Sequence, residues 1–187
     1  IKQLVQLAQD LTGLSPARLW QHRNLAIEGL KVGMKTVGRG PIVECRQSPP
    51  QLERLPLLKT WPEDGGGFIT LPLVYTEHPD SGHHNLGMYR IQRYDGQTTG
   101  VHWQIQKGGG FHYHVAEQRH EALPLTIFVG GPPALMLAAI APLPEGLREL
   151  LLASLLQGGR LQRVRNPTGG HPLIAEAEFA IQGLVPA

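Results

Sequence analysis

The residues that could do chemistry lie between Leu55 and Gly110, where charged and amide side chains stand among glycines. They fall in three runs, TWPEDGGGFIT, HHNLGMYRIQRYD and HWQIQKGGG. Arg90, in the second run, keeps its charge at any working pH and offers a planar fork to a carboxylate. Arg90 is therefore a candidate for holding an acidic substrate, although an isolated arginine is more often an edge-strand residue paired with a surface acid.

The glycines and histidines of this region offer two weaker signals. The runs Gly65 to Gly67 and Gly108 to Gly110 could let the backbone approach a phosphate, but neither has the context of a dinucleotide or Walker motif, and we expect turns. Three histidines follow the second glycine run: His112, His114 and His120. They could bind zinc together only on a strand, because residues two apart on a helix face nearly opposite sides. We expect these histidines to face solvent.

In their order and spacing, the three runs resemble the T-x-x-x-D-G-G-x-F-I-T, N-x-G-M-Y-R and H-W-Q-x-x-K-G-G motifs of the UbiD family of decarboxylases. The run FVGGPPALMLAAIAPLPEG, residues 128–146, extends the resemblance, which covers roughly residues 42–183. Enzymes of this family remove the carboxylate from aromatic and unsaturated acids on a prenylated flavin. The resemblance thus implies a carboxy-lyase similar to 3-polyprenyl-4-hydroxybenzoate decarboxylases.

The resemblance implies roles for individual residues. Arg90 corresponds to the arginine of the family's catalytic Glu-Arg-Glu network. Asn85 and Glu149 correspond to ligands of the divalent ion that anchors the flavin phosphate, and such oxygen ligands suit Mn²⁺ or Mg²⁺. Glu149 has a second explanation, because the helix dipole stabilises a carboxylate in the first turn of a helix by ~0.3–1 kcal/mol without any function.

Gln106 and Lys107 fall where the family places a glutamine and a basic residue against flavin and metal. Some members have a histidine ligand at the second position, but the ammonium group of Lys107 has no lone pair for a metal. The third protein ligand is therefore left open. Lys107 either neutralises a phosphate oxygen or is a solvated lysine that opens a glycine turn.

The same resemblance implies a flavin site with a defined lining and set of cofactors. The cofactors are prenylated FMN or FMN, Mn²⁺ or Mg²⁺, and a potassium ion. Trp61 and Trp103 are expected to pack against the sheet rather than to stack on a ring. The residues expected to contact the flavin are Thr70, Met88, Arg90, Gln106, Lys107, Ala139 and Ala141.

The family continues with an E-G-P-F-G-E loop and a closing domain, which supply two more catalytic carboxylates, and this sequence ends at Ala187 before either. We therefore expect decarboxylation by the full-length protein and none by the isolated chain. The implied partners are a carboxylic acid substrate, a flavin prenyltransferase that supplies the cofactor, and further copies of the protein. The alternative is a non-catalytic module that binds flavin or another partner.

Composition is that of a globular domain. The 187 residues suffice for one domain with a core, and 17 basic against 15 acidic side chains do not indicate nucleic-acid binding. Cys45 is the only cysteine, which excludes an intrachain disulfide and favours the cytoplasm. Glycines and prolines interrupt the uncharged run 122–144, so no membrane span is predicted. The start at Ile1, without a leader, indicates a chain that begins inside a longer product.

The elements that must position these residues follow from hydrophobic periodicity, which predicts helices over residues 1–14, 113–120, from 133 onward and over 146–157. Strands are predicted over 67–77, 87–94, 99–106, 125–129, 161–165 and 173–181. In the second of these strands, Met88 and Arg90 would point to the same face. The pattern predicts an α+β fold, and the resemblance implies a split β-barrel of mainly antiparallel strands with flanking helices. Residues 1–44 are interpreted as a helical or linker segment and 45–187 as the flavin-binding domain.

Overall fold

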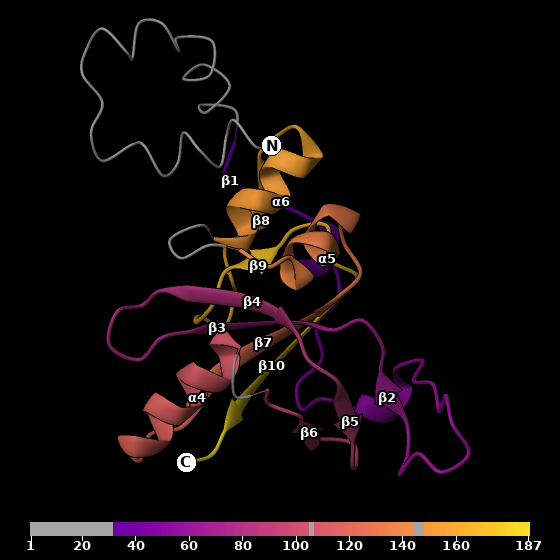
Figure 1. Cartoon of the computed structure of the whole chain (residues 1–187). Helices are drawn as coiled ribbons and strands as arrows, with labels where there is room; N and C mark the ends of the chain where they lie inside the picture. The colour runs from indigo at the N-terminus through magenta and orange to yellow at the C-terminus, as the bar shows by residue number, and fades with distance from the viewer. Residues whose placement is uncertain (1–31, 105–106, 144–147) are drawn as a thin grey trace, which may run out of the picture.

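The computed structural model of the protein describes residues 32–104, 107–143 and 148–187. A four-stranded antiparallel sheet crosses the middle of the molecule (Figure 1). The burial of β3 along almost its whole length explains why its sequence, LVYTE, lacks a polar face. In spatial order the strands are β10 Phe179–Val185, β7 Leu123–Val129, β3 Leu73–Glu77 and β4 His84–Met88.

Two smaller sheets flank the central one. The first consists of β2 Phe68–Ile69, β5 Ile91–Arg93 and β6 Thr99–Val101, all antiparallel. The second consists of β1 Met34–Val37, β8 Leu161–Val164 and β9 Leu173–Ile174, in which β1 and β8 run parallel. Strand β1 was not predicted, because it lies in the segment interpreted as helical or linker. The predicted domain boundary between residues 44 and 45 stays a prediction.

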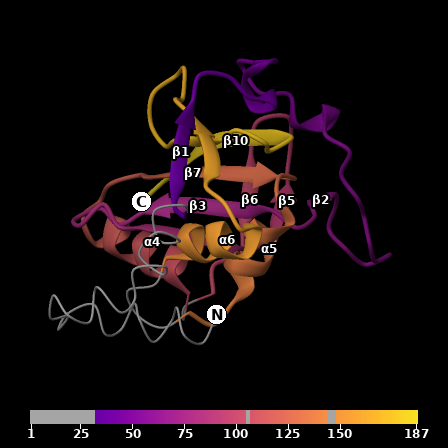
Figure 2. The same ribbon diagram turned by 90° about the horizontal axis from the view of Figure 1, so that it is seen from above.

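Helices α5 Pro133–Ile140 and α6 Glu149–Gln157 cover one face of the central sheet and α4 Gly108–Gln118 lies on the other (Figure 1). Seen from above, all three helices lie on the β3 side of β7 and β10 (Figure 2). Two 3₁₀ turns, Pro41–Val43 and Leu52–Arg54, lie earlier in the chain. A proline in the first turn starts α5, and Gly158 ends α6 in the left-handed conformation with φ 72°. Both helices were predicted from these signals and are confirmed. The predicted helix over residues 1–14 lies outside the described residues.

The central sheet separates two hydrophobic clusters. Leu73 of β3 belongs to the larger cluster, with Leu86, Phe128 and the buried residues of α5, α6, β8 and β9. Its neighbour Val74 belongs to the second cluster, with residues of β2, β5 and β7. Successive side chains of a strand point to opposite faces, so β3 divides the interior into these two parts.

Three of the predicted strands are each two shorter strands. The run 67–77 breaks at Leu71, which has φ 51°, and at Pro72, so β2 and β3 are separate. The run 87–94 breaks after Met88: β4 pairs with β3, whereas β5 pairs with β2 and β6. The run 173–181 divides into β9 and β10 in the same way. Met88 and Arg90 therefore do not share a strand face.

Helix α4 also differs from its prediction. It begins at Gly108, five residues before the predicted start at 113, so the three glycines form its first turn instead of a loop. Close packing requires glycines at this point, because a methyl group on Gly109 would lie 2.8 Å from the ring of Trp103. The close approach outweighs the low helix propensity of glycine.

The described residues thus form a mixed α+β fold with mostly antiparallel sheets, as predicted. None of the helices in this part of the chain has the length and apolar character that crossing a bilayer requires.

Candidate functional site

The start of α4 brings Asn85 of β4 against the glycines. A methyl group on Gly108 would overlap the amide oxygen of Asn85, so this oxygen packs directly on the backbone of the helix start. The amide nitrogen of Asn85 donates a hydrogen bond to the hydroxyl of Tyr89 at 3.5 Å, and Gly109 N–H donates to the same hydroxyl at 3.0 Å. Tyr89 therefore orients Asn85 so that its oxygen faces Gly108.

Glu149, the first residue of α6, reaches the exposed edge of the central sheet from the other side. Its carboxyl accepts hydrogen bonds from its own N–H and from the N–H of Leu86, the residue after Asn85. Burial raises the pKa of Glu149, and these two hydrogen bonds act in the opposite direction. Strand β4 and helix α6 thus bring an amide oxygen and a carboxylate to the same stretch of backbone.

Lys107 precedes α4 and is half-buried, but its side chain makes no capping hydrogen bond. The first N–H groups of a helix have no partner within the helix and favour anions, phosphate among them. The helix start, with Lys107 beside it, can therefore accept a phosphate group. Gln106 lies outside the described residues.

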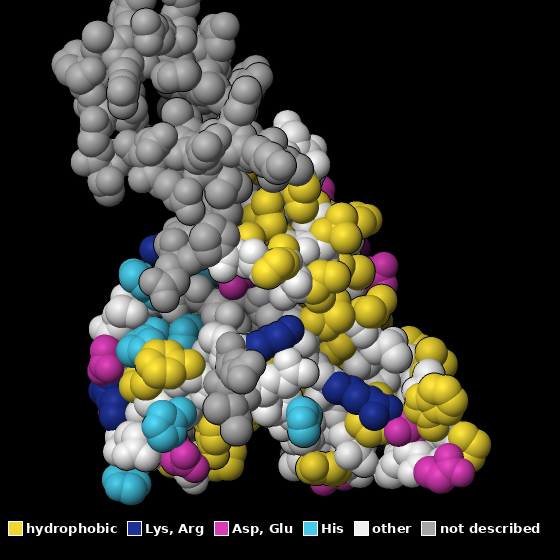
Figure 3. Space-filling model, in the orientation of Figure 1, with side chains coloured by type: hydrophobic (Ala, Val, Ile, Leu, Met, Phe, Trp, Pro, Cys, Tyr) yellow, Lys and Arg dark blue, Asp and Glu magenta, His cyan; other side chains and the backbone are white. Residues whose placement is uncertain are grey.

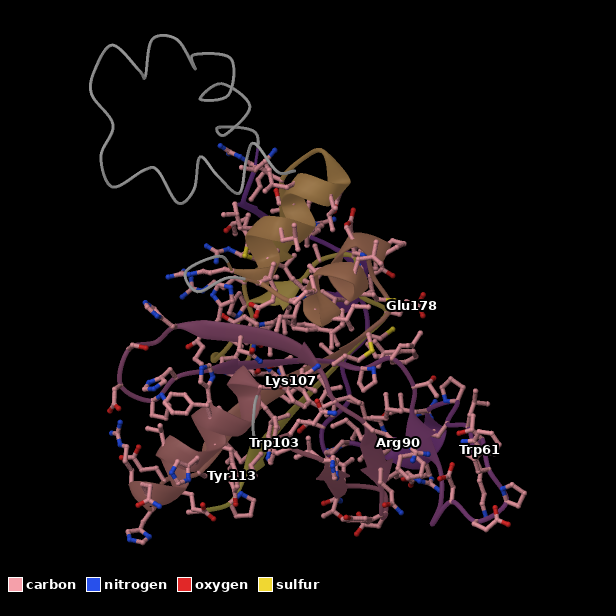
Figure 4. All side chains as sticks on the ribbon, in the orientation of Figure 1. Trp61, Arg90, Trp103, Lys107, Tyr113 and Glu178 are labelled. Carbon is pink, nitrogen blue, oxygen red and sulfur yellow. The ribbon has the colours of Figure 1, made fainter. Side chains whose placement is uncertain are left out.

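Arg90 lies in the two-residue connection between β4 and β5, on the β2–β5 side of the molecule, whereas Lys107 lies beside α4 (Figure 4). Its Nη2 donates to Oδ2 of Asp64 at 2.7 Å, and its guanidinium stands 3.6 Å from the centre of the Phe68 ring. The side chain is 50% exposed. A carboxylate ligand could therefore reach Arg90 from solvent.

The predicted apolar lining comes from two elements. Met88, at the end of β4, and Ala141, at the end of α5, pack against the larger hydrophobic cluster, which includes Ala139. Thr70 is exposed in the turn between β2 and β3. The structure therefore brings Met88, Ala139 and Ala141 to one cluster and leaves Thr70 apart from it.

Two expectations about aromatic residues and histidines are corrected. Trp61 is 68% exposed in the loop before β2 and does not pack the sheet, whereas Trp103 does pack, edge to face with Tyr89 at 5.0 Å. His112 is buried and hydrogen-bonded to Thr76 at 2.9 Å instead of facing solvent. Across the described ranges no three His, Cys, Asp or Glu side chains lie together as a metal site.

Sequence reasoning missed two residues that organise this region. Tyr89 lies inside the NLGMYR run and holds both Asn85 and Gly109. Asp64 lies inside the DGGGFIT run and pairs with Arg90 across 26 positions. The only signal in the sequence was that both residues lie inside the motif runs. No spacing rule links Tyr89 to Gly109 or Asp64 to Arg90.

The chain matches known proteins over most of its length. Residues 35–187 match the UbiD domain described as the 3-octaprenyl-4-hydroxybenzoate carboxy-lyase Rift-related domain. A Chlamydia pneumoniae protein, which is named as a subunit of 4-hydroxybenzoate decarboxylase, is 49% identical, over 90% of this chain and 29% of that protein. A Chlamydia caviae protein is also 49% identical, over 98% of this chain and 31% of that protein. The chain spans less than a third of the length of these relatives.

Solved structures agree with this match. The UbiD-class enzyme HmfF from Pelotomaculum thermopropionicum in complex with prFMN has a TM-score of 0.77 and 27% identity, over 88% of this chain and 40% of that one. The same enzyme in complex with FMN has a TM-score of 0.75 and 27% identity, over 88% of this chain and 38% of that one. The motifs, the match over residues 35–187 and the shared fold agree, and the chain belongs to the UbiD family.

Proposed function

We propose that this chain is the cofactor-binding part of a non-oxidative decarboxylase that acts on aromatic or α,β-unsaturated carboxylic acids. The observation that carries the proposal is that Asn85 and Glu149 reach the same stretch of β4: the amide oxygen of Asn85 packs on Gly108 at the start of α4, and the carboxyl of Glu149 accepts a hydrogen bond from the N–H of Leu86, the next residue. Two elements distant in sequence thereby present hard oxygen ligands beside a helix start that favours phosphate.

These groups fit a flavin phosphate held through a divalent ion. The amide oxygen of Asn85 and the carboxylate of Glu149 would hold Mn²⁺ or Mg²⁺, and Lys107 would neutralise a phosphate oxygen. The cofactor is prenylated FMN or FMN, which HmfF, a structural neighbour, binds. The residues that would contact the flavin ring are Thr70, Met88, Gln106, Ala139 and Ala141.

In the reaction, Arg90 would bind the substrate carboxylate through its guanidinium fork and orient an acid that returns a proton after CO₂ leaves. The prenylated flavin, when bound, supplies the electron sink for the charge that CO₂ leaves behind. Met88, Ala139 and Ala141 would keep water from the reacting centre, which strengthens the electrostatic contacts there.

The proposal extends to the whole protein. Its substrate would be an acid of the 3-polyprenyl-4-hydroxybenzoate type, in line with the name of the Chlamydia pneumoniae relative. The protein would be a homo-oligomer in the cytoplasm, and a flavin prenyltransferase would supply its cofactor. The described strands would form part of a split β-barrel.

Cofactor binding by the chain itself tests the proposal. FMN with Mn²⁺ is titrated into the chain, and flavin fluorescence reports binding. We expect Asn85→Ala and Glu149→Ala each to weaken FMN binding in the presence of Mn²⁺ and to have little effect without it, and the exposed Glu176→Ala to behave as wild type. Wild-type chain that binds neither FMN nor prenylated FMN would refute the proposal.

Turnover by the loaded chain gives a second test. The chain spans less than a third of its relatives' length. When catalytic groups act as a unit, the loss of one commonly removes most of the rate. We therefore expect the chain to release no CO₂ from 4-hydroxybenzoate or cinnamate. Turnover close to that of complete family members would show that the chain needs no further groups.

A further inference from the structure

The side chain of Arg90 needs an anchor outside the two strands that flank it. It lies in the connection between β4 and β5, and it is half exposed. A long, solvated side chain populates many rotamers, and binding a ligand with it requires that freedom to be lost. Residues that fix the guanidinium of Arg90 beforehand would remove this cost when Arg90 binds a carboxylate.

Asp64 supplies such a contact. Its Oδ2 accepts a hydrogen bond from Arg90 Nη2 at 2.7 Å, and its side chain is only 11% exposed, in contrast to that of Arg90. The same oxygen also accepts from Trp61 N–H and from the Thr60 hydroxyl, both at 3.3 Å. Asp64 is therefore fixed by its own loop before it meets Arg90.

Phe68 supplies a second surface. Its ring lies beneath the guanidinium, with 3.6 Å between Arg90 Cζ and the ring centre, a distance at which a cation is attracted to an aromatic face. Phe68 belongs to β2 and pairs with Gln92 of β5, the strand that follows Arg90. The ring therefore moves with the same small sheet as the backbone after Arg90, and it fixes the plane of the guanidinium.

Together these contacts leave donors for a ligand. A guanidinium has five N–H groups, and Asp64 engages Nη2. Among the described residues, no other carboxylate pairs with Arg90. Nη1 and Nε therefore remain available to an anion that approaches from the solvent side.

We propose that Asp64 is a positioning residue that, with Phe68, holds the guanidinium of Arg90 in the plane in which it binds the carboxylate of the substrate. This inference rests on the proposed function, because it assigns the substrate acid to Arg90. The negative charge of Asp64 on its own weakens the attraction of Arg90 for an anion. If Asp64 formed only a surface ion pair, its removal would therefore strengthen anion binding, whereas a positioning role predicts that its removal weakens anion binding.

Arginine side-chain NMR on the 187-residue chain tests the proposal without turnover. The Nε–H signal of Arg90 is assigned by its absence in Arg90→Lys, its relaxation reports the order of the side chain, and benzoate serves as the carboxylate probe. We expect Asp64→Ala to lower the order of Arg90 and to weaken its benzoate response about threefold to tenfold, the entropy of fixing one long side chain. Asp64→Asn, which keeps an acceptor, should retain part of the order.

The matched control is Asp80→Ala. Asp80 is an exposed carboxylate that pairs with Arg119 at 2.6 Å in the turn between β3 and β4, and its removal should leave Arg90 unchanged. If Asp64→Ala leaves Arg90 as ordered as in wild type, or makes benzoate binding equal or tighter, the proposal is overturned. If Asp64→Ala does not fold, the order in Asp64→Asn decides in the same way.

The two proposals fail differently. A wild-type Arg90 signal that does not respond to benzoate contradicts the assignment of the substrate to Arg90, and so contradicts the proposed function. The order of Arg90 in wild type and in Asp64→Ala is measured without benzoate, and this comparison still decides whether Asp64 holds the side chain.

Discussion

At the scale of single residues, Arg90 and Glu149 have different surroundings, and these suit different tasks. Arg90 is half exposed and held by one partly buried acid and one ring, so its charge is directed outward. Glu149 is half-buried, and its carboxyl faces the backbone edge of β4. A substrate that must enter and leave suits the first arrangement, and an ion that stays bound suits the second.

Replacing Arg90 by lysine should separate charge from geometry. Lysine keeps the positive charge but loses the planar fork and the stacking on Phe68. In a full-length UbiD-family protein that carries this chain, we expect Arg90→Lys to lower turnover of a saturating acid by ~10²–10³, the range for losing one aligned donor, with flavin absorbance retained. Arg119→Lys, in an exposed ion pair, is the control. Near-normal turnover by Arg90→Lys would show that Arg90 is structural.

Replacing Glu149 by glutamine tests the metal site. The amide still accepts hydrogen bonds from Leu86 N–H, but one anionic ligand is lost, so we expect Mn²⁺ affinity measured by calorimetry to fall roughly tenfold or more. The free energy of unfolding should change by no more than ~1 kcal/mol, the size of a helix-dipole effect. Glu176→Gln, at an exposed carboxylate, should change neither quantity. Unchanged Mn²⁺ affinity with a lower melting temperature would show that Glu149 only stabilises α6.

At the scale of elements, the site depends on the closeness of α4 to β4. The first turn of α4 lies against Asn85 and Tyr89, and only glycines leave room for both. Helix α5 adds Ala139 and Ala141 beside Met88, and α6 adds Glu149. Four separate elements therefore form the site, and the identity of a few small residues determines how near they come.

Gly108→Ala should disturb this arrangement at one point. The new methyl group would overlap the amide oxygen of Asn85, so the side chain or the helix start must shift, at a cost of about 1–3 kcal/mol in unfolding free energy. Mn²⁺ affinity should fall as well, because Asn85 moves. Gly38→Ala is the matched control, since Gly38 is exposed and a methyl group there meets no atom within 4 Å. Equal Mn²⁺ affinity in both variants would argue against Asn85 as a ligand.

The strand errors show what sequence periodicity can and cannot give. Alternation correctly located the extended runs at 67–77 and 87–94, and helix signals correctly located α5 and α6. The runs could not show that β2 and β5 leave the central sheet, because that depends on partners such as Gln92 and Phe68, which meet only in the fold. For the same reason the motifs gave Arg90 but not its contact with Asp64.

At the scale of the whole molecule, histidine side chains gather over α4 and the turn between β3 and β4 (Figure 3). His112 packs edge to face on His78 at 5.4 Å and is hydrogen-bonded to Thr76. Burial lowers the pKa of His112 to about 4, and the nearby His78, His84 and His83 act in the same direction. Burial also lowers the pKa of His84 and of His171. The folded protein therefore holds several histidines in the neutral form.

Figure 3 also shows hydrophobic side chains gathered over α5 and α6. Leu137 and Ile140 are more than half exposed there, and Leu156 is exposed beside them. An apolar area of this kind commonly marks a contact with another element or chain. Sequence periodicity missed it, because PALMLAAI is apolar all round and predicts a fully buried helix.

The buried histidine should make the fold sensitive to acid. Because the pKa of His112 is lower in the folded chain than the ordinary 6.5, the unfolded chain binds the proton more readily. The contribution of His112 to stability is therefore fully present above pH 6.5 and is lost as the pH falls toward 4, by on the order of 3 kcal/mol. His112→Asn cannot titrate, so urea unfolding between pH 7.5 and 4.5 should give a smaller loss of unfolding free energy than wild type, even if the variant is less stable at neutral pH. The loss should not vanish, since the pKa values of His84 and His171 shift in the same direction.

His114→Asn, at an exposed position of the same helix, should keep the wild-type dependence of unfolding free energy on pH. A wild-type slope in His112→Asn would mean that the acid sensitivity arises elsewhere.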